Sequence, residues 1–331
     1  MTDQKEVNAV SRVIVWRITQ SCNMKCRFCS YSTQVERLRS DADEAEIERL
    51  CNVLGEYRRQ TGEDILVSWI GGEPFLWKKI IPFSEKLRGY GIDVSTTTNG
   101  LLLNKKELRT GVLDNFSELV FSLDGFDEFD DAVRQHYGHF DAVSKNIKAL
   151  AEMRGDRMSD MKIKVNTILM RRNIQQFEEF CEYLLWLGVD EVTFNQLGGF
   201  DRPEFFEENR LTAEQAETFC KRLPTLQRDF GERGLVIRGS KRFLDRILKS
   251  SRNEVNPIEE CNPGSWFWFI NENGFISPCS YTSYEYKLDT KEIKSAEDFA
   301  KAEEFFRKCR SERRSKWCGD CCCTQVYDKF E

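Results

Sequence analysis

The first two hundred residues alternate between two patterns of hydrophobic and polar positions. Short apolar or β-branched runs, typical of buried strands, are separated by segments in which apolar residues recur every three or four positions, as on one face of a helix. Six runs are strand candidates: residues 12–18, 64–70, 92–98, 118–123, 162–169 and 190–196. The clearest helical spacing between them is that of Ile47, Leu50, Cys51, Leu54 and Tyr57.

This alternation predicts a parallel sheet, because parallel strands need long crossover connections that usually contain a helix. The pattern then changes. Residues 200–255 are charged and mostly helical, with one strand candidate at 235–238. From residue 261 onward, runs at 266–270 and 275–278 flank a turn that ends in Gly274, which predicts a β-hairpin. A helix is expected over 295–314.

Composition places the chain among ordinary globular proteins of about two domains. It has 331 residues, of which 40% are hydrophobic and 31% charged, with a net charge of −6. The mild acidity and alternating charge signs argue against nucleic acid as a partner. No apolar run approaches the roughly 18 to 20 residues that span a membrane, and the N-terminus has no secretory signal pattern. We therefore expect a cytoplasmic protein.

Thirteen cysteines and only two histidines are the unusual feature of this composition. Without a secretory signal, such a cysteine set indicates metal binding or catalysis more than a disulfide framework. The scarcity of histidine excludes most histidine-rich metal sites and disfavours histidine acid–base chemistry. His136 and His139 stand close together, and we expect both to be polar loop residues.

Three cysteines follow the first strand candidate, spaced as Cys22-x-x-x-Cys26-x-x-Cys29. Three thiolates on one short loop can bind three irons of a [4Fe–4S] cluster, which normally takes four thiolates, and so leave one iron open. Zinc is the alternative. Structural zinc sites are closed and tetrahedral, usually built from paired cysteines, so this spacing favours iron–sulfur.

This loop, together with motifs at the ends of later strand candidates, resembles the radical S-adenosylmethionine (radical SAM) enzymes over residues 12 to about 200. The aromatic residue before the third cysteine belongs to the pattern. The residues that carry the resemblance are Cys22, Cys26, Phe28 and Cys29; Gly71, Gly72, Glu73 and Pro74; Thr98, Asn99 and Gly100; and Ser122, Asp124, Gly125 and Arg134.

The resemblance implies a partial (β/α)6 TIM-type barrel with its active site at the carboxyl ends of the strands. It implies that Cys22, Cys26 and Cys29 hold three irons of a [4Fe–4S] cluster, while the amino and carboxylate groups of SAM chelate the fourth. In the family, the reduced cluster cleaves SAM to methionine and a 5′-deoxyadenosyl radical, which abstracts a hydrogen atom from the substrate. An external one-electron donor such as flavodoxin or ferredoxin is implied.

For SAM itself, the resemblance implies that Gly71, Gly72 and Glu73 meet the methionyl ammonium. Arg134 is suited to the methionyl carboxylate, because its planar guanidinium pairs well with carboxylates. The alternative for Arg134 is a surface ion pair with Asp130 or Asp131. Pro74, Thr98 and Asn99 complete this part of the expected cofactor-binding set.

At the nucleoside of SAM, the expected contacts come from several strand ends. Phe28 packs by the cluster and the adenine, and Ser122 and Asp124 take ribose hydroxyls. Asn166, Gln196 and Leu197 lie along the nucleoside edge. For Asn166 and Leu197, a place in the barrel core is the alternative.

A second set of cysteines lies near the C-terminus. It resembles the Twitch region, the short form of the SPASM extension in radical SAM enzymes, and implies an auxiliary [4Fe–4S] cluster with zinc as the alternative. The expected ligands are Cys261, Cys279, Cys318 and Cys321, and Cys309, Cys322 or Cys323 is the alternative to one of them. Cys51, Cys181 and Cys220 are expected in the core, as buried cysteines behave like small hydrophobes.

No conventional catalytic side chain is evident in the sequence. Cys322 and Cys323 are candidate hydrogen-atom donors to a substrate radical. The loop after the sixth strand contains Asp201 and Arg202 and is a candidate lid over a polar substrate, with an exposed connector as the alternative.

The expected organisation is a radical SAM core at 1–205, a helical connector at 206–255 and a cluster-bearing domain at 256–331. The expected substrate is a small polar metabolite of sugar, aminocyclitol or nucleoside type in natural-product biosynthesis. Oxidation, epimerisation or decarboxylation are the outcomes considered. The alternative is a maturase that crosslinks or epimerises a ribosomally made peptide, which we rank second because Cys22 comes too early for a leader-binding domain to precede it.

Overall fold

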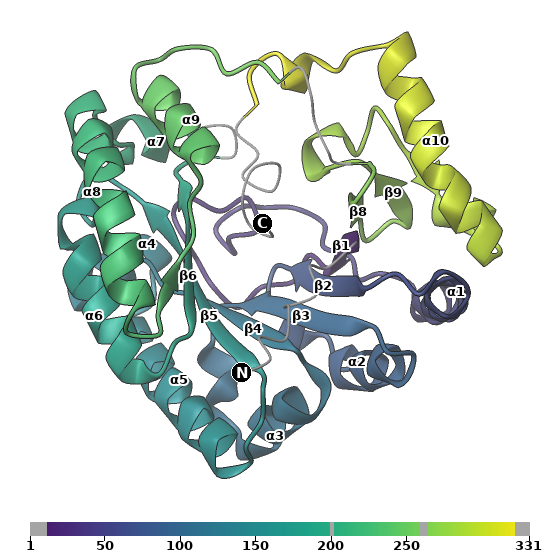
Figure 1. Cartoon of the computed structure of the whole chain (residues 1–331), viewed down its shortest axis with the longest axis horizontal. Helices are drawn as coiled ribbons and strands as arrows, with labels where there is room; N and C mark the ends of the chain where they lie inside the picture. The colour runs from purple at the N-terminus through teal and green to yellow at the C-terminus, as the bar shows by residue number, and fades with distance from the viewer. Residues whose placement is uncertain (1–11, 199–201, 259–263, 322–331) are drawn as a thin grey trace, which may run out of the picture.

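A computed structural model describes residues 12–198, 202–258 and 264–321 of the chain. Its strands form one curved sheet in the order β10-β9-β8-β1-β2-β3-β4-β5-β6-β7, and β1 through β7 pair in parallel (Figure 1). The strands are β1 (Arg12–Thr19), β2 (Ile65–Gly71), β3 (Asp93–Thr98), β4 (Glu118–Ser122), β5 (Lys162–Leu169), β6 (Glu191–Gln196), β7 (Val236–Ile237), β8 (Phe267–Ile270), β9 (Phe275–Ser277) and β10 (Leu288–Asp289).

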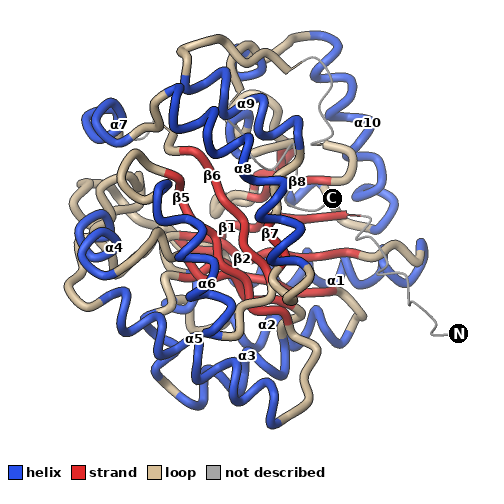
Figure 2. The backbone as a smooth tube through the Cα atoms, turned by 60° about the vertical axis from the view of Figure 1, so that its left-hand side comes forward, coloured by secondary structure: helices blue, strands red, loops and turns tan. Residues whose placement is uncertain are grey.

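Helices cover the outer, convex face of this sheet (Figures 1 and 2). The helices of the described residues are α1 (Glu44–Thr61), α2 (Ile80–Gly89), α3 (Lys106–Asn115), α4 (Asp127–Arg134), α5 (His139–Asp156), α6 (Phe177–Leu187), α7 (Pro203–Asn209), α8 (Ala213–Gly231), α9 (Lys241–Ser251) and α10 (Ala296–Glu312). Of these, α4 and α7 contribute to an apolar cluster at the strand ends. The predicted strands, including 235–238 and the hairpin, are confirmed to within one residue at each end. The fold is the expected α/β partial barrel.

The two faces of β1 contribute side chains to two different apolar clusters. Ile14, Trp16 and Ile18 belong to the large apolar core between sheet and helices. Val13 and Val15 point to the opposite side, where they pack with aromatic side chains of β8. Because successive side chains of a strand alternate between faces, one strand builds both the outer core and the inner wall.

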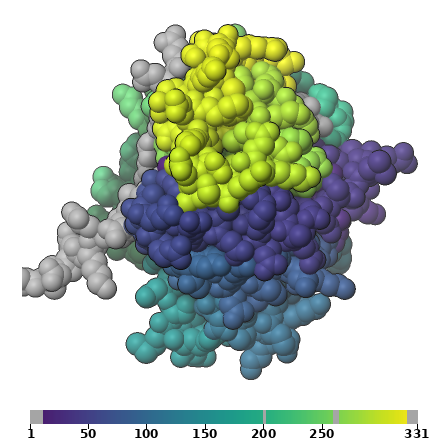
Figure 3. All heavy atoms as spheres, turned by 90° about the vertical axis from the view of Figure 1, so that its right-hand side faces the viewer, coloured from purple at the N-terminus to yellow at the C-terminus, as the bar shows by residue number. Residues whose placement is uncertain are grey.

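The C-terminal hairpin extends the barrel sheet. β8 pairs in parallel with β1 from Val13↔Phe267 to Trp16↔Ile270, and β9 turns back antiparallel to β8. In Figure 3 the yellow and green C-terminal segment lies directly against the purple and blue N-terminal one. The domain boundaries expected near residues 205 and 255 remain predictions, and the sheet itself runs across both.

Helix α10 fastens this extension to the barrel. Its buried Phe299 lies edge-on to Trp268 of β8, with ring centroids 4.3 Å apart, and to Tyr57 of α1 at 4.9 Å. The indole of Trp268 also lies under the guanidinium of Arg12 at 4.7 Å. Within the described residues, no helix is both long and apolar enough to cross a membrane.

We expect Phe299→Ala to lower the free energy of unfolding by about 3–5 kcal/mol, because it removes a fully buried ring and leaves a cavity. Urea unfolding followed by tryptophan fluorescence measures the effect. Phe305→Ala on the same helix is the matched control, since that side chain is 37% exposed and its removal should cost much less. Equal losses in the two variants would contradict the packing described here.

Candidate functional site

The three cysteines of the first motif lie on a loop that leaves the carboxyl end of β1; residues 20–40 are called the cysteine loop below. Cys22, Cys26 and Cys29 lie near enough to one another for each thiol to influence the ionisation of the others. Burial raises the pKa of Cys22 to about 11 and that of Cys26 to about 12. These thiols therefore need a bound cation to exist as thiolates at neutral pH.

Arg39 holds the cysteine loop in shape. Its guanidinium donates to the carbonyl oxygens of Gln20, Tyr31, Ser32 and Val35, at 2.8 to 3.4 Å. These oxygens belong to a segment without regular secondary structure, so the side chain supplies hydrogen bonds that a helix or strand would otherwise provide. Sequence reasoning missed Arg39, because no spacing or motif marks it.

The Gly71–Gly72 segment packs directly against the cysteine loop. The Gly72 amide donates to the Thr19 carbonyl at 3.0 Å, and the Glu73 amide donates to the Ser21 carbonyl at 2.8 Å. A Cβ atom on Gly72 would lie 2.2 Å from the Ser21 carbonyl oxygen, a separation that no real contact allows. A residue without a Cβ atom is therefore required here, because the backbone approaches the loop that carries the cysteines so closely.

Glu73 joins the ends of β2 and β3. One carboxylate oxygen accepts from the Thr98 hydroxyl at 2.7 Å and from the Phe75 amide at 3.1 Å, and the other accepts from the Asn99 amide at 2.8 Å. Burial raises the pKa of Glu73 to about 6, against the opposing effect of these donors. Pro74 begins a short 3-10 turn beside it, η1 (Pro74–Leu76).

Asn99 continues this connection to the cysteine loop. Its side-chain amide donates to the Asn23 side-chain oxygen at 2.8 Å. The structure therefore brings the motifs at Gly71–Pro74 and Thr98–Gly100 together with the cysteine loop at one edge of the sheet, as their positions at strand ends predicted.

A buried polar network is built around Asp124 and Arg134, two residues of the motif that follows β4. Arg134 donates through Nη2 to Asp124 at 2.7 Å and through Nε to Asp130 at 3.2 Å. Asp130 in turn bonds Nδ1 of His139, whose Nε2 lies 3.0 Å from the Asn99 carbonyl. The second oxygen of Asp124 accepts from the Ile168 amide at 2.8 Å. All four side chains are buried, so the network ties the ends of β3, β4 and β5 through paired charges.

This network changes the interpretation of three predicted residues. The Arg134–Asp130 ion pair, one of the alternatives, is present, although it is buried and not on the surface. Both oxygens of Asp124 already have protein partners, and burial raises its pKa. The expectation that His139 is a polar loop residue is wrong: it begins α5, fully buried, with both ring nitrogens bonded. His136 lies in the turn before it, half-buried.

The remaining nucleoside-edge candidates lie on the inner wall or next to it. Ser122 and Asn166 are paired across β4 and β5. The Asn166 side-chain oxygen accepts from the side chains of Thr193 at 3.0 Å and Asn195 at 2.9 Å. This polar wall was not expected from the sequence.

Leu197 and Phe28 belong to an apolar cluster over the strand ends. Gln196 is the last residue of β6, directly before Leu197. Leu197 is buried in this cluster, and Phe28 packs on its edge. The ring of Phe28 lies 6.5 Å from that of Phe205 in α7 and beneath the Arg134 guanidinium at 5.7 Å.

A second buried ion pair connects the cysteine loop to the C-terminal hairpin. Glu272, in the turn between β8 and β9, accepts from Arg17 of β1 and from the Gln20 side chain. Arg17 also donates to the Tyr31 hydroxyl. Glu272 has an almost fully buried side chain, and its role was not evident from a turn sequence that predicts only a hairpin.

The C-terminal cysteines come together in part. Cys279 follows β9. Burial raises the pKa of the Cys318 thiol, and the nearby Cys279 thiol raises it further. The segment that holds Cys318 and Cys321 pairs with residues 256–258: the Ile258 amide donates to the Cys318 carbonyl, and the Cys321 amide to the Asn256 carbonyl, both at 2.9 Å.

Four predicted site residues, Cys261, Cys322, Cys323 and Asp201, lie outside the described residues. Arg202 is described and pairs through Nε with Glu204. Cys51 and Cys181 are fully buried in the main core, which confirms their expected packing role, and Cys220 and Cys309 lie at its edge.

The donor set fits a cluster better than a single ion. Within the described residues, no three His, Cys, Asp or Glu side chains converge on one metal position. Zinc requires its donors about 2.0 to 2.3 Å from one point. A four-iron cluster instead takes each thiolate on a different iron. Three thiols near one another on one loop can supply one thiolate to each of three irons.

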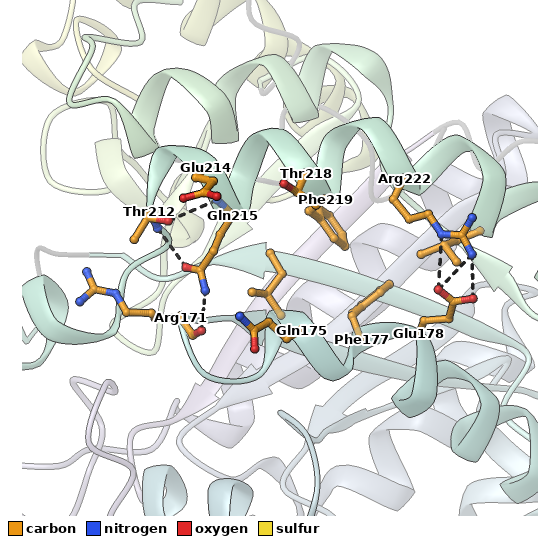
Figure 4. A pocket seen from close by; sticks show the side chains of 12 residues that line it. Arg171, Gln175, Phe177, Glu178, Thr212, Glu214, Gln215, Thr218, Phe219 and Arg222 are labelled. Carbon is orange, nitrogen blue, oxygen red and sulfur yellow. Dashed lines mark hydrogen bonds and ion pairs between the residues drawn. The ribbon is translucent and has the colours of Figure 1, made fainter.

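A separate cleft of about 600 Å³ lies on the outer helical layer, between α8 and the segment formed by η3 (Ile174–Gln176) and α6 (Figure 4). Phe177 and Phe219 form its apolar floor, and the Arg222–Glu178 ion pair closes one end. None of its lining residues is a predicted site residue, so we place no chemistry there.

Comparisons with known proteins agree with this geometry. Residues 16–184 match the family described as the radical SAM superfamily. The chain is 23% identical to the AdoMet-dependent heme synthase of Oleidesulfovibrio alaskensis, covering 94% of this chain and 80% of that protein. It is 22% identical to the mycofactocin maturase MftC of Mycobacterium tuberculosis, covering 93% and 75%.

Among solved structures, SuiB of Streptococcus suis bound to S-adenosylmethionine superposes with a TM-score of 0.68 at 16% identity, over 95% of this chain and 72% of that one. The structure of anSMEcpe with bound AdoMet gives 0.64 at 17% identity, over 93% and 88%. At these identities the superpositions establish the fold and nothing about the substrate.

We expect Gly72→Ala to displace the cysteine loop, because its methyl group has no room beside the Ser21 carbonyl. Iron bound after anaerobic reconstitution should fall by at least half relative to wild type. Gly89→Ala at the end of α2 is the control, since a Cβ there meets no atom within 4 Å, and it should retain full iron. Full iron in Gly72→Ala would rule out the close approach.

We expect Asp130→Asn to destabilise the protein by about 3–5 kcal/mol, because it leaves the buried Arg134 charge without one of its partners. Thermal unfolding by circular dichroism measures the change. Asp127→Asn, at an exposed position of the same helix, should unfold within about 0.5 kcal/mol of wild type. A similar midpoint for both variants would show that the network contributes little.

Proposed function

This chain belongs to the radical SAM superfamily, and we propose that it is an enzyme that cleaves SAM reductively to modify a peptide substrate. The observation that carries the proposal is the set of three mutually close thiols on the loop after β1, which packs against the Gly71–Gly72 backbone. When bound, a reduced [4Fe–4S] cluster supplies the electron that splits SAM into methionine and a 5′-deoxyadenosyl radical able to take a hydrogen atom.

In this proposal, each nearby side chain has a defined task. Cys22, Cys26 and Cys29 hold the cluster. Arg134 uses Nε and Nη2 for its aspartates, so Nη1 is the nitrogen we assign to the methionyl carboxylate of SAM. Glu73 bonds the ends of β2 and β3 to each other and would position the backbone that meets the methionyl ammonium.

We assign the nucleoside of SAM to Phe28, Ser122 and Asn166. Phe28 lies beside Arg134 and faces the adenine, and Ser122 offers its hydroxyl to the ribose. Asn166 presents its amide nitrogen along the nucleoside edge, since Thr193 and Asn195 donate to its oxygen and so orient the group.

We propose that the C-terminal cysteines hold an auxiliary [4Fe–4S] cluster. The proximity of Cys279 to Cys318, and the pairing of the Cys318–Cys321 segment with residues 256–258, support this. Residue 258 is three positions before Cys261, the fourth proposed ligand. The buried Arg17–Glu272 pair connects this region to the cysteine loop.

The substrate proposal reverses the order of preference expected from the sequence. Similarity over 93% of this chain to a maturase, MftC, favours a ribosomally made peptide that is crosslinked or epimerised. A small non-peptide substrate is the second candidate, because a heme synthase is similar over 94% of the chain. In either case an external flavodoxin or ferredoxin supplies the electron.

Reconstitution with iron and sulfide under anaerobic conditions tests the cofactor proposal. Two clusters predict about eight irons per chain. The triple variant Cys22→Ala/Cys26→Ala/Cys29→Ala should lose about four of them and all SAM cleavage, whereas Cys279→Ala/Cys318→Ala should lose the other four. Cys51→Ala, in the buried core, is the control and should keep every iron. A colourless zinc protein would refute the proposal.

Transfer of deuterium into 5′-deoxyadenosine identifies the substrate class. The enzyme is incubated with SAM, dithionite and an extract of perdeuterated cells. The mass of the 5′-deoxyadenosine that forms is then measured by mass spectrometry. For a peptide substrate, protease treatment of the extract should abolish the transfer. Transfer that survives protease treatment would favour the small molecule.

A further inference from the structure

We propose that Glu272, in the turn of the C-terminal hairpin, is a positioning residue for the [4Fe–4S] cluster of the cysteine loop. It acts through Arg17 and Tyr31, which keep a backbone hydrogen bond on the sulfur of Cys29. Glu272, Arg17 and Tyr31 are called the relay below. The proposal rests on the function proposed above, since it assumes that the thiols of the loop hold a cluster.

Glu272 reaches the cysteine loop from a segment far along the chain. It lies in the turn between β8 and β9, and the parallel pairing of β8 with β1 brings this turn to the carboxyl end of β1 (Figure 1). One oxygen of its buried carboxylate accepts from Nε of Arg17, and the other accepts from the Gln20 side chain. Because an unpaired charge in this setting is costly, the carboxylate holds both donors in one arrangement.

Arg17 transmits this constraint to Tyr31. While Nε is bonded to Glu272, Nη1 donates to the Tyr31 hydroxyl. The guanidinium carbon lies 5.5 Å from the centre of the Tyr31 ring and 5.2 Å from that of Phe269. The guanidinium is planar, so bonds on two of its nitrogens and a ring beside it leave it one orientation. The position of the Tyr31 side chain therefore depends on Glu272 through a single rigid group.

The backbone of Tyr31 is fixed beside the proposed cluster. Its carbonyl oxygen accepts from Arg39 at 2.9 Å, and its amide donates to the Cys29 sulfur at 3.4 Å. The anchors at the hydroxyl and at the carbonyl together decide whether the amide reaches this sulfur. An N–H···S hydrogen bond disperses the negative charge of a ligand thiolate, so it stabilises the reduced and more negative form of a cluster.

The relay carries no net charge of its own, because Arg17 and Glu272 form an ion pair. Its effect on the cluster should therefore depend on geometry. Three substitutions disturb the geometry and leave every charge in place. Glu272→Asp shortens the carboxylate by one methylene, Arg17→Lys replaces the planar fork by a single ammonium, and Tyr31→Phe removes only the hydroxyl.

The test is a redox titration of the anaerobically reconstituted full chain, followed by electron paramagnetic resonance with and without SAM. The signal that changes when SAM is added identifies the cluster of the cysteine loop. The iron content of each variant is measured in the same samples.

Arg154→Lys is the matched control. Arg154 is also forked, between the Asp190 carboxylate and the Gly188 carbonyl. Asp190 directly precedes β6, so this pair lies at the amino ends of the strands, away from the cysteine loop.

We expect the SAM-responsive cluster to become harder to reduce in all three relay variants. The equilibrium between reduced and oxidised cluster should fall at least about threefold, which for a one-electron couple is a shift of about 28 mV to more negative potential. Iron content should match that of wild type, and Arg154→Lys should titrate as wild type does. Glu272→Asp/Tyr31→Phe should shift no further than Tyr31→Phe alone, because both changes break the same connection.

A wild-type potential in Glu272→Asp and Arg17→Lys would overturn the proposal, as would full additivity in the double variant. Arg17→Lys breaks the same contact from the other side, so the test does not depend on how well Glu272→Asp folds. Absence of any SAM-responsive signal in the wild-type protein would instead refute the proposed function. The two failures are thus distinguishable.

Discussion

The parallel pairing of β1 to β6 is the constraint on which the other features of this protein depend. Parallel strands end at the same edge, so the segment that follows each one emerges beside its neighbours. The cysteine loop follows β1, Gly72 and Glu73 follow β2, and Asn99 follows β3. Residues far apart in the chain are thereby placed within hydrogen-bond distance, as are Asn99 and Asn23, which are 76 positions apart.

Sheet pairing alone does not determine the conformation of the irregular segments, which buried polar side chains hold in place. Glu73, Arg39 and Glu272 each connect pieces of backbone that have few hydrogen bonds of their own. The Asp124–Arg134–Asp130–His139 network does the same between strand ends. Because an unpaired charge in such a setting is costly, each member holds its partners in one arrangement. A rigid site of this kind suits chemistry that depends on positioning a cofactor and excluding water.

Much of this could be predicted from residue patterns. Strand and helix positions follow from local periodicity, and the spacing of Cys22, Cys26 and Cys29 is a strong signal because the chemistry of an open cluster dictates it. The expectation for His139 failed because two histidines in a polar stretch give no sign that one is buried. Arg17, Arg39 and Glu272 were missed for a related reason: charged residues normally lie on the surface, and nothing local marks these as exceptions.

Residue patterns along the chain were enough to predict which segments are strands, which cysteines share a loop and which motifs stand at strand ends, since each is a property of neighbouring residues. The partners of the buried charges, by contrast, follow from the three-dimensional fold. Arg17 and Glu272 are 255 residues apart, and His139 and Asn99 are 40 apart. The structure also decided that the C-terminal hairpin joins β1 and extends the barrel sheet. Such contacts depend on how the whole sheet curves and closes, and no local pattern contains that information.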